Sequence, residues 1–330
     1  MMDTKSPKLL ELVRETLRTK HYSYRTEQAY VDWIKRFVIF HNKRHPREMG
    51  AEEVQTYITY LANERRVAAS TQNQALSAIV FLYKYVLQKE IILPSDILRP
   101  GRPERLPTVL SHQEAMAVIG KMKGTPKLIV QLLYGSGLRV TECLRLRVKD
   151  LDFANHQVIV RDGKACPELV EGGENDRATV LPDSLVSALK SQVEITRLIH
   201  QKDLKEGFGE VSLPYALAQK YPNAPKEFAW QYVFPSLNRS VDPVSKRTKR
   251  HHLDVTVVQK AVHQAALAAG LDKPISPHTF RHTFATQLLQ NGYDIRTVQE
   301  LLGHKDVKTT MIYTHVLQRG AGAVKSPLDT

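Results

Sequence analysis

The C-terminal half of the sequence contains side chains whose types and spacing suit the cleavage of a phosphodiester without a metal ion. Such a reaction needs a nucleophile to attack phosphorus, cations to neutralise the pentacovalent oxygens, and an acid to protonate the leaving 5′-oxygen. Two arginines, two histidines and a tyrosine supply groups of these kinds: Arg139, Arg281, His278, His304 and Tyr313. Their interpretation depends on the motifs around them.

The first motif places an arginine at the expected start of a helix. Arg139 follows a glycine-bounded stretch, Gly135–Leu138, and Glu142 stands three residues after it. This spacing lets Glu142 share the helix face of Arg139 and orient its guanidinium group. Arg/Glu pairs at helical spacing are also common on solvated surfaces, so the motif is weak by itself.

The second motif, His278-Thr279-Phe280-Arg281, places an imidazole and a guanidinium group one turn apart on one helix face. Ser276-Pro277 puts this turn at a helix N-terminus, where free N–H groups favour phosphate. His278 and His282, at i and i+4, could instead be metal ligands or core histidines. A zinc site needs a third ligand and usually a nearby carboxylate. The HTFRH segment contains neither, so we expect no metal site.

The third motif, Leu302-Gly303-His304, is followed nine residues later by Tyr313. A single tyrosine among thirteen is more often a core or surface residue, so its interpretation depends on the whole set. In order and spacing, the set resembles the motifs of the tyrosine recombinases of the lambda-integrase and Xer group: Arg139, His278-x-x-Arg281, Leu302-Gly303-His304 and Tyr313. The resemblance covers nearly the whole chain.

This resemblance implies an enzyme that cuts and rejoins DNA. Tyr313 would attack the scissile phosphate and form a 3′-phosphotyrosyl bond. Arg139 and Arg281 would bind that phosphate, and His278 and His304 would add hydrogen bonds. Because the energy of the broken bond stays in the phosphotyrosine, the resemblance implies no metal ion, no ATP and no other cofactor.

The general acid of this family is a lysine in a turn between two strands that reads roughly GKGxKxR. Lys164 stands at the expected distance after Arg139, so the resemblance assigns it this role. The turn is interrupted by about eight residues, Ala165–Gly172, which add two acids, and Asn175 stands near the place of the second lysine. The insertion could bulge harmlessly into solvent, or it could misplace Lys164.

Helices must position these side chains, and the hydrophobic pattern predicts two mainly helical domains. Residues 1–92 contain apolar stripes at helical spacing around Trp33, Ile58 and Ile79, and the resemblance identifies them as a SAM-like, core-binding domain that clamps DNA. Residues 93–108 hold four prolines and a glycine, which predicts a linker.

Residues 109–330 are expected to form an α+β catalytic domain with a small antiparallel sheet. A capping box at Ser111 begins two helices that end near Leu146. Val158–Val160 and Thr179–Leu181 are predicted strands. Further helices are predicted at about 183–203 and 255–269, from Ser276-Pro277 to Asn291-Gly292, and from Asp294 to Gly303.

Composition indicates the partner. The 330 residues include 47 Lys and Arg against 34 Asp and Glu, a formal charge of +13, which favours nucleic acid as the partner.

Cys143 and Cys166, the only cysteines, argue against a disulfide framework. The N-terminus lacks the apolar core of a signal peptide, and no apolar run approaches the ~20 residues of a membrane span. We therefore expect a soluble protein of the bacterial cytoplasm.

A segment at about 214–252 resembles the extra segment of integron integrases, which Xer recombinases lack. In that family the segment grips a folded single-stranded site through bases that protrude from its hairpin. The matching positions are Trp230, Pro243, His251 and His252. Aromatic and imidazole rings stack on unpaired bases, although Trp230 could also be a core residue. Lys249 and Arg250 belong to a basic cluster expected to contact phosphate.

Together these features predict an integron integrase that integrates or excises gene cassettes as a homotetramer on duplex and hairpin DNA. One alternative is a Xer- or phage-type recombinase that acts only on duplex sites. Another is a DNA-binding descendant that no longer cleaves, which the insertion after Lys164 would favour.

Overall fold

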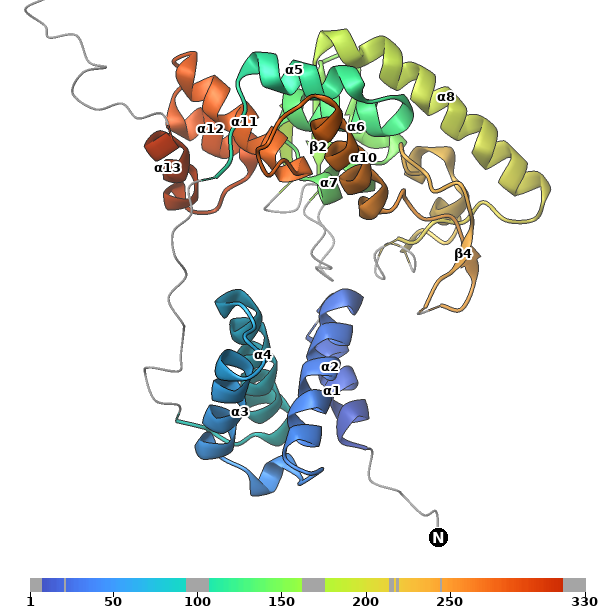
Figure 1. Ribbon diagram of the computed structural model, residues 1–330. Helices are drawn as coiled ribbons and strands as arrows, with labels where there is room; N and C mark the ends of the chain where they lie inside the picture. The colour runs from blue at the N-terminus through green and yellow to red at the C-terminus, as the bar shows by residue number, and fades with distance from the viewer. Residues whose placement is uncertain are drawn as a thin grey trace, which may run out of the picture. The chain divides into compact units, whose positions relative to one another are not determined.

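The computed structural model describes residues 8–20, 22–92, 107–161, 176–213, 217, 220–243 and 245–316. These residues belong to two compact units, one holding residues 8–92 and the other holding residues 107–316 (Figure 1). Most of the expected linker, residues 93–106, lies outside the described ranges, as does Lys164. The mainly α fold with small antiparallel sheets confirms the predicted fold class.

The first unit is a bundle of helices. Its elements are α1 (Leu9–Thr19), α2 (Tyr24–Phe40), the short η1 (Pro46–Glu48), α3 (Ala51–Asn63), α4 (Ala69–Phe81) and the π-helical η2 (Leu82–Leu87). The predicted stripes are buried in one core, which includes Trp33, Ile58 and Ile79. Between α1 and α2, the buried carboxylate of Glu27 accepts a hydrogen bond from Arg18 at 2.9 Å.

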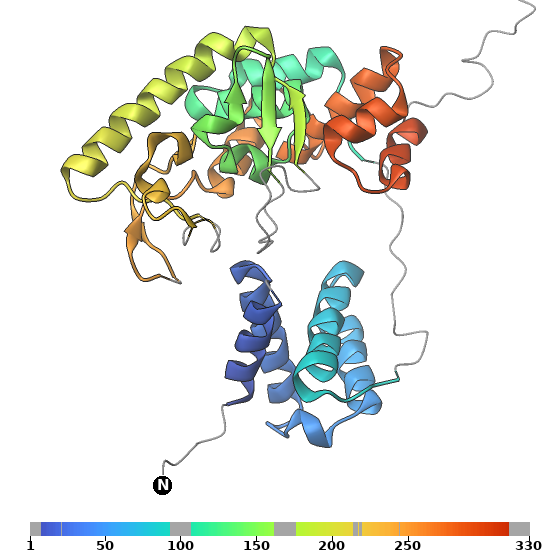
Figure 2. The ribbon, with the colours of Figure 1, turned by 180° about the vertical axis from the view of Figure 1, so that it is seen from behind.

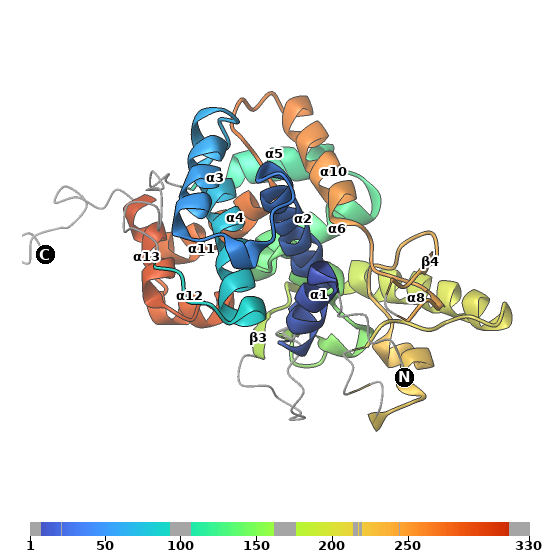
Figure 3. The same cartoon turned by 90° about the horizontal axis from the view of Figure 1, so that it is seen from below.

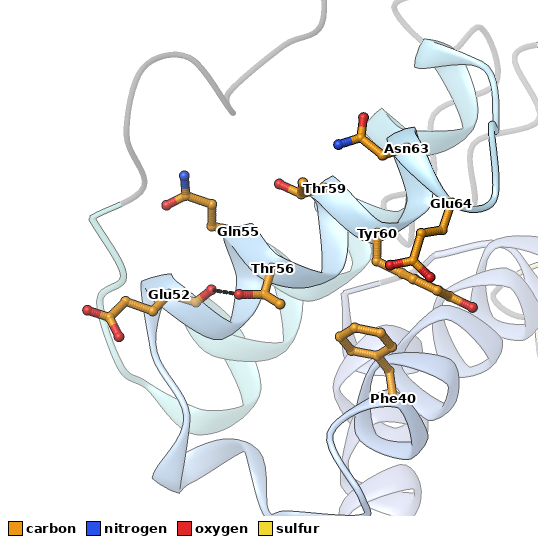
Figure 4. Close-up of a pocket in the computed structure, with 8 residues that line it drawn as sticks. All are labelled: Phe40, Glu52, Gln55, Thr56, Thr59, Tyr60, Asn63 and Glu64. Atoms are coloured by element: carbon orange, nitrogen blue, oxygen red, sulfur yellow. Dashed lines mark hydrogen bonds between the residues drawn. The ribbon is translucent and has the colours of Figure 1, made fainter.

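A groove lies on the surface of this unit beside α3 (Figure 4). Phe40 and Tyr60 form its aromatic side. The other lining residues are polar: Glu52, Gln55, Thr56, Thr59, Asn63 and Glu64. Two of these are carboxylates and none is a cation, so the groove does not suit a phosphate group.

The second unit begins with three helices where the sequence predicted two: α5 (His112–Lys121), α6 (Gly124–Ser136) and α7 (Val140–Arg145). The capping box at Ser111 is present. The unpredicted break lies between α5 and α6, whereas the helix start predicted at Arg139 is confirmed. Gly137 ends α6 before it with a φ of 65°. A Cβ at Gly137 would lie 2.4 Å from the ring of Phe284, so this turn requires glycine.

After the turn η3 (Val148–Asp150), three short strands form an antiparallel sheet in the order β1-β2-β3: β1 (Leu151–Asp152), β2 (Gln157–Val160) and β3 (Arg177–Val180). Val158 lies opposite Thr179, and Val160 lies opposite Arg177. Both predicted strands are therefore confirmed. Figure 2 shows this sheet, in green, from the back of the molecule.

The remaining elements are α8 (Asp183–Lys205), η4 (Ala224–Lys226), η5 (Phe228–Trp230), β4 (Ser240–Val241), β5 (Thr248–Lys249), α10 (Val255–Ala268), α11 (Pro277–Gln290), α12 (Ile295–Leu302) and α13 (Val307–Val316). Asp294 caps α12, and Gly303 ends it in the left-handed conformation. Helix α11 packs on α6, and α13 packs on α11 and α12 (Figure 3). Within the described ranges, no helix has the length and apolar character needed to cross a bilayer.

Candidate active site

Three separate parts of the second unit meet around the guanidinium group of Arg281. Arg139 and Glu142 come from the start of α7, Arg281 comes from α11, and His304 follows α12. Arg281 lies 3.6 Å from Glu142 and 3.1 Å from His304, and the ring of His304 stacks on that of Tyr313 at 6.3 Å. These contacts join four of the six residues to which the sequence assigned a catalytic role, through Glu142 in the case of Arg139. Of the other two, His278 lies near enough for the charges of Arg281 and Arg139 to act on it, and Lys164 is outside the described residues.

The carboxylate of Glu142 lies between two arginines. It accepts hydrogen bonds from the side chain of Arg139 at 2.5 Å, from the backbone N–H of Arg139 at 2.8 Å and from Arg177 at 2.8 Å. Burial alone would raise the pKa of Glu142, but the hydrogen bonds and charges of Arg177 and then Arg139 lower it to about 2. An ionised Glu142 therefore holds the partly exposed Arg139 guanidinium group in place.

Arg177 was not among the predicted site residues. Besides binding Glu142, its Nε donates to the carbonyl oxygen of Leu301 at 2.9 Å, which ties β3 to the end of α12. A Cβ on Gly303 would lie 2.8 Å from the Arg177 side chain, so Gly303 leaves room for it. The available signal was the last position of the GKGxKxR pattern, which Arg177 occupies in the sequence.

Arg281 is only 3% exposed. Its guanidinium group donates to the carbonyl oxygens of Gly137 at 2.6 Å and Leu302 at 2.7 Å. Burial, followed by the charge of Arg139, lowers the pKa of Arg281 to about 10. Arg281 therefore remains protonated at neutral pH, and the two carbonyl groups fix the plane of its cation.

The surroundings of His304 determine its tautomer. Nε2 lies 3.1 Å from Arg281, which can only donate, so Nε2 accepts. Nδ1 then carries the proton and donates to the hydroxyl of Thr310 at 2.9 Å. Burial first, and then the charges of Arg281 and Arg139, lower the pKa of His304 to about 4, which keeps the ring neutral. In this structure His304 positions Arg281, whereas the sequence predicted a hydrogen bond to phosphate.

Tyr313 is 2% exposed, and its hydroxyl lies 3.0 Å from Nδ1 of His282. Burial raises the pKa of Tyr313, whereas the charges of Arg281 and Arg139 and a hydrogen bond from Arg281 oppose this rise. His278 stands on the exposed face of α11. Desolvation and the charges of Arg281 and Arg139 lower the pKa of His278. The site therefore combines a phenol, guanidinium groups and imidazoles, the groups expected for attack on a phosphodiester.

Metal ligands do not gather in this site. No group of three or more His, Cys, Asp or Glu side chains could hold a metal ion within the part of the chain that the structure describes. The rings of His278 and His282 lie 6.5 Å apart, but His282 faces the hydroxyl of Tyr313.

The ionised Glu142 predicts a pH-dependent stability. Because a carboxyl pKa lowered from 4.5 to about 2 corresponds to about 3 kcal/mol, we expect Glu142→Gln to lower the free energy of unfolding by about that amount at pH 7. The folded state binds the proton less well than the unfolded state, so this contribution is present above pH 4.5 and is lost as the pH falls towards 2. Urea unfolding of the wild type and the variant at pH 7 and pH 3 measures this contribution to the free energy of unfolding.

Glu194→Gln is the matched control, since Glu194 forms an exposed ion pair with Arg197 and should change stability little. If Glu142→Gln costs the same free energy at both pH values, the side chain stabilises the site by its shape and not by its charge.

In the described part of the segment at 214–252, η5 contacts η3, and Arg250 pairs with Asp203 of α8. The ammonium group of Lys149 lies over the ring of half-buried Trp230 at 3.2 Å. His251 stacks on Tyr232, and His252 contacts the same ring edge-on. Pro243 is exposed in the turn between β4 and β5. Trp230, His251 and His252 are therefore partly accessible rings held against protein cations or aromatic groups.

Arg250 is held by protein groups. Its guanidinium group pairs with the buried carboxylate of Asp203 and donates to the carbonyl oxygens of Ser236 and Leu237. Arg250 therefore anchors the segment to α8, and its predicted contact with phosphate stays a prediction. Lys249 is 14% exposed and lies 3.8 Å from Asp242, which also limits its reach.

Fold and site together define a class, the tyrosine recombinases, and the comparisons agree. Residues 108–319 match the Phage integrase family, and residues 9–93 match the Phage integrase, N-terminal SAM-like domain. The chain belongs to the phage integrase family and is a tyrosine recombinase, an enzyme that cuts and rejoins DNA.

Individual relatives support this assignment. An integrase/recombinase of Escherichia coli is 48% identical over 98% of this chain and 94% of its own length. Tyrosine recombinase XerC of Halalkalibacterium halodurans is 30% identical over 80% of this chain and 76% of its own. The solved structure of a lambda integrase(75-356) dimer bound to a COC′ core site is similar in fold, with a TM-score of 0.61 at 14% identity over 96% of this chain and 98% of that one.

Proposed function

We propose that this recombinase acts through a 3′-phosphotyrosyl bond to Tyr313. The observation that carries the proposal is the buried contact network that links Tyr313, His304, Arg281 and Glu142. Arg139 and Arg281 bind the scissile phosphate, and His278 adds a hydrogen bond from the exposed face of α11. Lys164 protonates the leaving 5′-oxygen. Glu142 and His304 position the two arginines.

We further propose that the enzyme is an integron integrase. Residues 1–92 would be the core-binding domain that clamps DNA, residues 93–108 the linker and residues 109–330 the catalytic domain, and four copies would assemble on DNA. The segment at 214–252 would hold protruding bases of a folded single-stranded cassette site. The partly accessible rings of Trp230, His251 and His252 support this, because base stacking needs an aromatic face.

The experiment that tests cleavage is incubation of the full chain with a suicide substrate, nicked beside the expected cut, followed by denaturing electrophoresis for a covalent protein–DNA adduct. Adduct on a hairpin with protruding bases, in preference to a fully paired duplex, supports the integron assignment. Adduct on duplex alone supports a Xer-type enzyme, an alternative that is compatible with the 30% identity to XerC. The absence of adduct on both supports a cleavage-inactive descendant.

Trp230→Ala is expected to weaken binding to a hairpin with protruding bases by roughly 1–3 kcal/mol, the usual contribution of one base–aromatic stack. Binding to a fully paired duplex of the same length should change much less, because its bases are not accessible. Fluorescence anisotropy at fixed salt measures both affinities. Tyr293→Ala is the matched control, since Tyr293 is an exposed aromatic residue outside the segment. Equal losses on both DNAs would mean that Trp230 maintains the fold of the segment.

A further inference from the structure

The hydroxyl of Tyr313 has a specific neighbour that the motifs of the family do not assign. Nδ1 of His282 lies 3.0 Å from it, and the two rings are 5.6 Å apart between centroids. His282 follows Arg281 on α11, and Tyr313 lies on α13, so the packing of two helices creates this contact. We propose that His282 is the catalytic base that removes the phenolic proton of Tyr313 during attack on phosphorus. This inference rests on the proposed function, in which Tyr313 is the nucleophile.

The geometry of this contact suits proton transfer. At 3.0 Å the phenolic hydrogen can point at Nδ1 of His282, provided that Nδ1 is the unprotonated ring nitrogen, which is the tautomer the proposal requires. The charges of Arg281 and Arg139 favour the phenolate of Tyr313 and so oppose the effect of its burial. In that tautomer the ring proton of His282 is on Nε2.

His282 is also in the correct protonation state. Burial first, and then the charges of His278 and Arg281, lower the pKa of His282 to about 4. The charged and titratable groups around His282 are His278 and Arg281 on its own helix, Tyr313 on α13 and His304 after α12. None of them is an acid that would hold a proton on the ring. A phosphate bound at Arg281 offsets part of the positive charge and makes His282 more basic.

Each proton that moves during cleavage returns during rejoining. In cleavage, the Tyr313 oxygen bonds to phosphorus, its proton moves to Nδ1 of His282, and the P–O5′ bond breaks as the 5′-oxygen takes a proton from the general acid. In rejoining, the 5′-hydroxyl attacks phosphorus and returns its proton to the group that acted as the general acid in cleavage. The imidazolium of His282 then protonates the departing Tyr313 oxygen. No metal ion or co-reactant is needed.

Two substitutions separate proton transfer from positioning. An asparagine side chain places its amide near the position of Nδ1, so His282→Asn retains a hydrogen-bonding group for Tyr313 but cannot take its proton. His282→Gln removes the group from that position. We expect both variants to form the adduct roughly 10²–10⁴-fold more slowly at pH 7, the range for a lost general base. His263→Gln, an exposed histidine on α10, is the control and should react at the wild-type rate.

The pH profile gives the second readout. Without the base only phenolate attacks, so single-turnover adduct formation by His282→Asn should rise about tenfold per pH unit between about pH 6 and 9, because this range lies below the pKa of Tyr313, which burial raises above its ordinary value. The wild type should rise much less. A fluorinated tyrosine at position 313, whose phenol is more acidic, should restore the rate of His282→Asn.

Wild-type rate or wild-type pH dependence in His282→Asn would overturn the proposal and leave His282 as a positioning residue. Duplex binding and the thermal midpoint, measured on the same preparations, show whether each variant is folded. The nucleophile itself is tested separately by Tyr313→Phe. If that variant forms the adduct, the proposed function fails, whatever His282 does.

Discussion

Tyr313→Phe is expected to abolish the covalent protein–DNA adduct and to leave DNA binding nearly unchanged. The substitution removes the oxygen that attacks phosphorus but no cation, since Arg139 and Arg281 remain. It also removes one partly buried hydrogen bond, to His282, so the free energy of unfolding should fall by only about 1 kcal/mol. A suicide substrate labelled on the strand that stays attached, resolved by denaturing electrophoresis, measures the adduct.

Tyr293→Phe is the control for the chemical change, because Tyr293 is an exposed tyrosine in the loop between α11 and α12. It should form the adduct at the wild-type rate. An adduct of normal yield from Tyr313→Phe would show that another residue is the nucleophile. The remaining tyrosines of the second unit would then be tested in the same way.

Lys164→Ala is expected to slow cleavage by roughly 10²–10⁴-fold, the range for loss of a positioned proton donor. The leaving 5′-oxygen is a poor leaving group unless it is protonated as the P–O bond breaks. A substrate with sulfur in place of that bridging oxygen should restore the rate, since a thiolate leaves without a proton. Single-turnover cleavage of the two substrates by wild type and variant gives the comparison. A normal rate with the oxygen substrate would place the acid elsewhere.

The insertion after Lys164 gives a second variant. Deletion of residues 165–172 should leave binding unchanged and preserve or raise the cleavage rate, because a shorter turn holds Lys164 at a lower cost in ordering entropy. If the unmodified chain cleaves nothing and the shortened chain cleaves, the protein as it stands is a binding descendant of a recombinase.

Local patterns in the sequence determined the helices and their ends. The stripes around Ile58 and Ile79 lie on helices because apolar side chains at spacings of three and four residues share one face. Ser111 and Asp294 cap helices through hydrogen bonds that reach only two or three residues along the chain. Such features depend on neighbours in sequence, and for that reason they were predictable before the fold was known.

The break between α6 and α7 had a different origin. Gly137 was visible in the sequence, but its requirement for a turn comes from Phe284 on α11, which occupies the space where a side chain would be. The spacing around Arg139 predicted a helix start there, which the structure confirms, but the reason for the turn before it lies in the packing of α11 on α6. A residue distant along the chain decided this piece of local structure.

The motifs likewise determined which residues gather in the site, whereas the tertiary structure decided what each one contacts. Arg177 meets Glu142 although 35 positions separate them, and Arg250 meets Asp203 across 47. His282, which could have been a metal ligand or a core residue, meets Tyr313 across 31 positions. Sequence spacing identifies partners within one helix, but a charge or a hydrogen-bonding group takes whichever partner the packing of helices and strands brings within about 3 Å of it.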